Sequence, residues 1–68
     1  MYLKTVESLV NIRNGYFLIQ ENELRFYAGE GYLIYKASDP GKLLNMITES
    51  LLLGNILLDL TDIDLEDL

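Results

Sequence analysis

A chain of 68 residues has room for one small domain, and this one carries eleven acidic and five basic side chains but no cysteine and no histidine. The missing cysteines and histidines exclude thiol chemistry, a disulfide scaffold, zinc sites of the usual kind and histidine acid–base catalysis. Half of the residues are hydrophobic, which excludes a disordered chain.

The first segment, residues 1–13, fits two periodicities. Leu3, Val6, Leu9 and Val10 form a helical stripe, whereas Val6, Ser8, Val10 and Ile12 alternate as in a strand. We favour a strand from about Val6, because the turn that follows needs a partner strand before it and β-branched residues are frequent here. A short N-terminal helix that enters a three-stranded sheet is the alternative.

Three turn signals divide residues 11–37 into short antiparallel strands. They are Asn14-Gly15, Glu21-Asn22 and Gly29-Glu30. Asn-Gly is the strongest short-range hairpin signal, since both residues tolerate the positive φ of a type I′ turn, and a leading glycine suits a type II′ turn. The second turn lacks glycine and is the weakest. Two-residue turns set three pairs opposite each other: Arg13 and Tyr16, Gln20 and Glu23, Ala28 and Gly31.

These registers sort the side chains onto two faces, because side chains alternate along a strand. One face is apolar, with the rows Ile12, Phe17, Phe26, Leu33 and Val10, Ile19, Leu24, Tyr35. The other is mixed, with the rows Arg13, Tyr16, Tyr27, Tyr32, then Asn11, Leu18, Arg25, Ile34, then Leu9, Gln20, Glu23, Lys36. The opposite charges of Glu23 and Lys36 support this register. The apolar face is the predicted core.

A helix is predicted next, with Asp39 as N-cap and Pro40 at its first position, where a missing N–H is not needed. Gly54 is its stop signal. One helical arc carries Leu43, Leu44, Met46, Ile47 and Leu51. We therefore expect an α+β fold, an antiparallel meander of three or four strands covered on one face by a single helix. Leu52 points away from the arc.

The composition changes at Asp59. Residues 1–58 form the predicted small α+β domain and carry six acidic and five basic side chains, whereas residues 59–68 carry five acids and no base. This acidic-hydrophobic C-terminal tail has three interpretations. It is a disordered, solvating end, or residues 55–60 add an edge strand whose acids keep it from aggregating, or it is a recognition segment that docks leucines in a groove while its carboxylates meet basic residues.

No sequence pattern indicates catalysis or a bound cofactor. The alternation of Asp62, Asp64 and Glu66 lacks the glycine and the terminal glutamate of a calcium loop. Gly29-Glu30-Gly31 is too short for a phosphate cradle and precedes a strand. We expect no enzyme, no metal and no cofactor. We expect no direct nucleic-acid binding either, since the tyrosine row lacks a positive groove.

The predicted function is a non-enzymatic, small acidic protein-interaction module. It would regulate or inhibit a protein partner with a basic surface. The most specific version of this hypothesis is that the protein occupies a nucleic-acid groove of its partner as a nucleic-acid mimic. The alternative is a self-assembling structural protein, a possible homodimer, that buries the tyrosine row or Leu52. The candidate partner-binding residues are Arg13, Tyr16, Tyr27, Tyr32, Leu52, Asp59, Asp62, Asp64, Leu65, Glu66 and Asp67.

The same sequence predicts a cytoplasmic location without membrane contact. Residues 1–10 contain no apolar signal region, and no apolar run approaches the ~18 residues that a membrane span needs.

Overall fold

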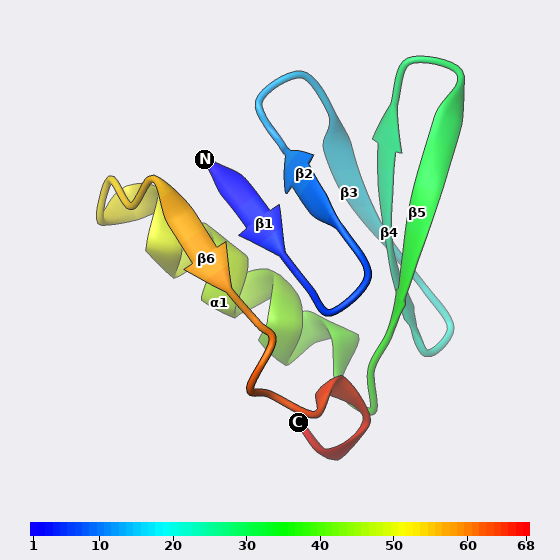
Figure 1. The fold of residues 1–68 in the computed structure, drawn as a ribbon. Coiled ribbons are helices and arrows are strands. Elements are labelled where there is room, and N and C mark those ends of the chain that lie inside the picture. Colours follow the sequence, from blue (N-terminus) through cyan, green and yellow to red (C-terminus); the bar gives the residue numbers. More distant parts are fainter.

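The computed structural model describes residues 1–68 as two three-stranded sheets and one α-helix (Figure 1). The elements are β1 (Tyr2–Lys4), β2 (Leu9–Asn11), β3 (Tyr16–Gln20), β4 (Glu23–Ala28), β5 (Gly31–Lys36), α1 (Pro40–Leu52), β6 (Leu57–Asp59) and the short 3-10 helix η1 (Leu65–Asp67). The first sheet has the order β2-β1-β6, and the meander has the order β3-β4-β5. The predicted α+β class, with an antiparallel meander and one helix packed against strands, is confirmed.

The register of the meander is the predicted one. Gln20 faces Glu23, Ala28 faces Gly31 and Glu23 faces Lys36. In both two-residue turns only the first residue has a positive φ, 56° at Glu21 and 61° at Gly29, which is the pattern of a type II′ turn. The rows Phe17-Phe26-Leu33 and Tyr16-Tyr27-Tyr32 therefore form as predicted, with Leu24, Phe26 and Tyr35 buried.

The predicted hairpin at Asn14-Gly15 is wrong. β2 pairs with β1 and β3 pairs only with β4, so the chain turns here from one sheet into the other. Neither turn residue has the positive φ of a type I′ turn. Gly15 serves close packing instead, because a Cβ there would lie 2.3 Å from Cζ of Phe26 and 2.5 Å from the Tyr27 carbonyl oxygen.

The residues before this turn consequently lie outside the meander. This corrects the rows that included Leu9, Val10, Asn11, Ile12 and Arg13. Ile12 is still buried, but it reaches the core from the segment that links the two sheets.

The N-terminal segment is a hairpin, so the alternative of an N-terminal helix is wrong. β1 pairs antiparallel with β2, and the turn between them is held by the Thr5 N–H to Ser8 carbonyl bond (2.8 Å) and by the two hydroxyls of these residues (2.9 Å). β6 lies on the other side of β1 and runs parallel to it. The further edge strand proposed for residues 55–60 is therefore present, as β6.

Helix α1 begins and ends at the predicted signals. The Asp39 carboxylate accepts the Lys42 N–H at 3.0 Å, Pro40 opens the first turn, and Gly54 follows the C-cap with a φ of 74°. Leu43 and Ile47 are buried, and Leu44 and Met46 pack against the core. Leu51 is exposed, contrary to the predicted arc, because buried Ser50 occupies that side of the last turn and accepts the Asn55 side-chain N–H at 3.0 Å.

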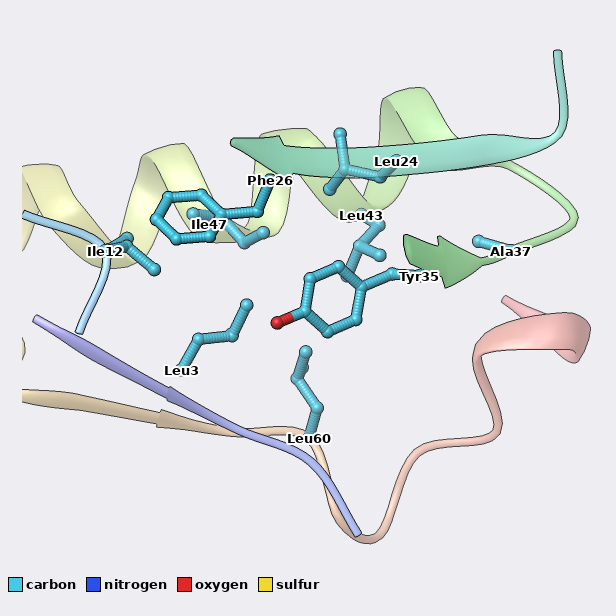
Figure 2. Packing of buried hydrophobic residues seen from close by; sticks show 9 residues of the cluster. All are labelled: Leu3, Ile12, Leu24, Phe26, Tyr35, Ala37, Leu43, Ile47 and Leu60. Carbon is cyan, nitrogen blue, oxygen red and sulfur yellow. The ribbon is translucent and has the colours of Figure 1, made fainter. Parts of the chain in front are cut away.

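The hydrophobic core lies between the helix and the two sheets and draws on both ends of the chain. Figure 2 shows Tyr35 of the meander between Leu3, Leu43 and Leu60, with its hydroxyl directed toward Leu3. Leu60, which follows β6, is only 2% exposed. The single helix is too short and too polar to cross a membrane.

We expect Gly15→Ala to lower the free energy of unfolding by about 1–3 kcal/mol, because the added Cβ overpacks the contact with the Phe26 ring and the Tyr27 carbonyl. Gly31→Ala is the control, since a Cβ at Gly31 meets no atom within 4 Å. Urea unfolding of both variants measures the difference. Equal stability of the two would contradict the packing role of Gly15.

Candidate functional site

The acidic segment, residues 59–68, is anchored through its apolar side chains. The Leu60 N–H donates to the Lys4 carbonyl at 2.8 Å, and the Leu60 side chain is buried in the core. Leu65 and Leu68 pack against the same core. The composition boundary at Asp59 thus falls inside β6, and the segment shares the core of residues 1–58.

A second set of contacts fixes the end of the acidic segment to the loop after β5. The Ser38 N–H donates to the Leu65 carbonyl at 3.3 Å, and the Ser38 hydroxyl donates to the Glu66 carbonyl. The η1 backbone is therefore held at the end of the meander (Figure 1). Leu65, a predicted partner contact, is engaged within the molecule.

Two of the five acids stabilise the backbone of the segment itself. The Asp59 carboxylate accepts from the Thr61 hydroxyl at 2.6 Å and from the Thr61 N–H at 2.9 Å, and these bonds lower the pKa of Asp59. Asp64 caps η1 by accepting the Glu66 N–H at 3.0 Å. The side chains of Asp62, Glu66 and Asp67 make no such bond, and all five carboxylates are exposed.

Acids from a distant part of the chain join this segment in space. A shallow depression of about 620 Å³ is lined by Glu21 from the β3–β4 turn, by Glu23 at the start of β4, and by Glu66 and Asp67 from η1. We call these four residues the acidic pole. Lys36 also lines the depression, and Glu23 is paired with Arg25 at 3.0 Å. The remaining three carboxylates, those of Glu21, Glu66 and Asp67, therefore share the depression with a single lysine, Lys36.

The sequence did not point to Glu21 and Glu23 as site residues. The turn at Glu21-Asn22 and the pairing of Glu23 with Gln20 are predicted, but the arrival of η1 beside that turn depends on the long-range packing of Leu60 and Leu65. No local signal in the sequence encodes this proximity.

The tyrosine row lies on the outer face of the meander, and its aromatic rings pack on one another. The Tyr16 and Tyr27 rings are stacked with centroids 5.2 Å apart, and the Tyr27 and Tyr32 rings are 5.3 Å apart. Arg13, predicted to adjoin these tyrosines, is separated from them because β2 does not pair with β3.

Arg25 takes the place beside the tyrosines that Arg13 was predicted to have. Its guanidinium lies 5.4 Å from the Tyr32 ring centroid, and it donates to the Tyr27 hydroxyl and to the Glu23 carboxylate. These two hydrogen bonds raise the pKa of Arg25. Since its charge is already paired with Glu23, the row offers a contact surface without a free positive groove.

Leu52 belongs to an exposed apolar end of the molecule. Leu52 is 82% exposed, Leu53 78% and Ile56 79%. The sequence predicts only Leu52 as a contact residue at this end, because the loop after the helix shows no periodicity that identifies Ile56.

An apolar groove of about 360 Å³ separates the β1–β2 turn from the edge of β5. Its walls are residues 5–8, residues 33–36 and the side chains of Leu60, Ile63 and Leu65. The buried Tyr35 hydroxyl beside it has no hydrogen-bond partner, and burial raises the pKa of Tyr35. No group of three or more aspartates and glutamates is arranged to hold a metal ion.

No protein-family model, no curated protein and no solved structure matches this chain. Function therefore has to be inferred from the surfaces described above.

We expect Leu60→Ala to lower the free energy of unfolding by about 2–5 kcal/mol, because Leu60 fills the core between β1 and Tyr35. The matched Leu52→Ala change, at a side chain in solvent, should change it by less than about 0.5 kcal/mol. Urea denaturation gives both values. A small effect at Leu60 would show that residues 59–68 do not belong to the folded core.

Proposed function

We propose that this protein is a non-enzymatic interaction module that binds the basic surface of a protein partner through the acidic pole and the exposed acids of residues 59–68. One observation carries the proposal: the carboxylates are exposed on a backbone that the core and Ser38 hold in place. A solvating tail needs no such anchoring. Charges fixed in advance lose less conformational entropy on binding, so they favour recognition.

The depression concentrates negative potential. Glu21, Glu66 and Asp67 come from two segments but line one hollow, where only Lys36 opposes them. A cluster of one sign accelerates encounter with an oppositely charged surface and disfavours neutral partners. Carboxylates at this density also resemble the phosphates of a nucleic acid, so a groove that normally holds nucleic acid is the partner surface with the best chemical match.

The decisive variant neutralises three acids without touching the fold. Asp62→Asn, Glu66→Gln and Asp67→Asn combined remove three charges, while Asp59 and Asp64 are kept because their carboxylates bond to the backbone. The control variant combines Glu7→Gln, Glu30→Gln and Glu49→Gln, which changes the net charge equally at residues that belong neither to the acidic pole nor to residues 59–68. Thermal midpoints verify that both variants fold.

We expect the first variant to associate about tenfold more slowly with a partner captured from lysate and identified by mass spectrometry, and the control variant to associate nearly as fast as the original protein. Association should also slow between about 0.1 M and 0.5 M NaCl, since salt screens exposed charges. Surface plasmon resonance measures the rates. Displacement by duplex DNA would identify the partner surface as a nucleic-acid groove.

Unchanged binding by the first variant would contradict the acidic site. The tyrosine row would then be the surface to test, by Tyr16→Ala and Tyr32→Ala.

A further inference from the structure

The outer edge of β5 is the longest unpaired strand edge in the molecule. β5 has six residues and pairs only with β4, whereas the other edge strands have three or five residues. Backbone groups alternate sides along a strand, as the neighbouring residues show: the Ala37 N–H donates to Asn22 on the β4 side and the Ser38 N–H to Leu65 on the other side. The backbone groups of Tyr32, Ile34 and Lys36 therefore face outward, where they make no backbone hydrogen bond.

This edge has few of the features that keep strands from pairing with other chains. It contains no proline, its pairing with β4 runs without a bulge, and its single charge, Lys36, is at the end. Tyr32, Leu33 and Ile34 in its middle are exposed, and the apolar groove opens beside Leu33 and Ile34. The whole chain exposes 4772 Å², more than the about 4,400 Å² typical of a folded monomer of 7.8 kDa.

We propose that β5 pairs antiparallel with β5 of a second copy, about a two-fold axis that passes between the two Leu33 residues. Tyr32 then faces Ile34 of the second copy, and each such pair exchanges both of its N–H···O bonds, because both residues direct their backbone groups outward. Glu30 faces Lys36 of the second copy at both ends, so the charges are complementary. The two meanders become one six-stranded sheet.

The position of η1 excludes the register that is shifted toward the end of β5. An axis at Ile34 would set Glu30 opposite Ser38, where Leu65 already occupies the edge. With the axis at Leu33, the paired segment ends at Lys36, just before that contact. The two Leu33 side chains then meet on the inner face of the sheet beside the apolar groove. This contact covers the Leu33 side chain, which is 39% exposed in the single chain.

A cysteine placed on the axis tests the register directly, because the chain has no cysteine of its own. Facing residues that do not exchange hydrogen bonds have Cα atoms about 4.5 Å apart, which a disulfide can bridge. We expect Leu33→Cys to form a covalent dimer almost completely under mild oxidation. Ile19→Cys is the matched control, on the same face of the other edge strand and 46% exposed, and it should stay monomeric.

A second variant blocks the edge without a cross-link. Ile34→Pro removes an N–H that β4 does not use and should convert a dimer into a monomer in light scattering, whereas Ile34→Thr keeps the N–H and should remain dimeric. Far-UV circular dichroism shows whether the proline variant is folded. If it is not, the cysteine pair decides the question.

Cross-linking of Ile19→Cys to the same extent as Leu33→Cys, or of neither, would overturn the proposal. So would a monomeric mass for the original protein at all concentrations, or loss of the dimer on Leu52→Glu, which would move the interface to the apolar end. The triple variant at Asp62, Glu66 and Asp67 should dimerise like the original protein, also in about 0.5 M NaCl. A result that contradicts the dimer is thereby distinguished from a result that contradicts binding through the acidic pole.

Discussion

The burial of Leu60 beside Tyr35 and Leu3 is the interaction on which the rest of the structure depends. A chain this short hides only about 60% of its unfolded surface, so each fully buried leucine is a large part of its stability. Leu60 comes from the end of the chain and Leu3 from its beginning, and both pack on Tyr35 of the meander (Figure 2). The contact holds β6 against β1, so it also determines where the acidic segment lies.

The local parts of this fold could be predicted from the sequence. The turns at Glu21 and Gly29 and the cap at Asp39 are specified by neighbouring residues, and the structure has them as expected. The pairing of strands in the first sheet could not be predicted. Its strands have three residues each, and β6 pairs with β1 across more than fifty positions, so no short-range pattern records the pairing. Asn14-Gly15 was misread because the same dipeptide that permits a type I′ turn also permits the close approach of Phe26.

The candidate site was only partly predictable for the same reason. The acids of residues 59–68 were evident from composition, but which of them bond to the backbone, as Asp59 and Asp64 do, depends on geometry. Glu21 reaches the site only because η1 docks beside its turn. Arg13 was assigned to the tyrosines through the misread turn, and Arg25, two residues from Glu23 on the same strand face, takes that place.

In the acidic segment, packing and surface charge reside on separate chemical groups. Its leucines stabilise the core, whereas the exposed carboxylates of Asp62, Glu66 and Asp67 bond to no other group, so the charge at these three positions can vary without loss of packing. Pairing through β5 would leave both the packing and the exposed charge of this segment intact, because the paired edge ends at Lys36 and η1 lies beyond it. Such a dimer carries two acidic poles on one rigid sheet. A partner with repeated basic sites would then bind the second pole at a high effective concentration, so that two individually weak, salt-sensitive contacts together give a strong one.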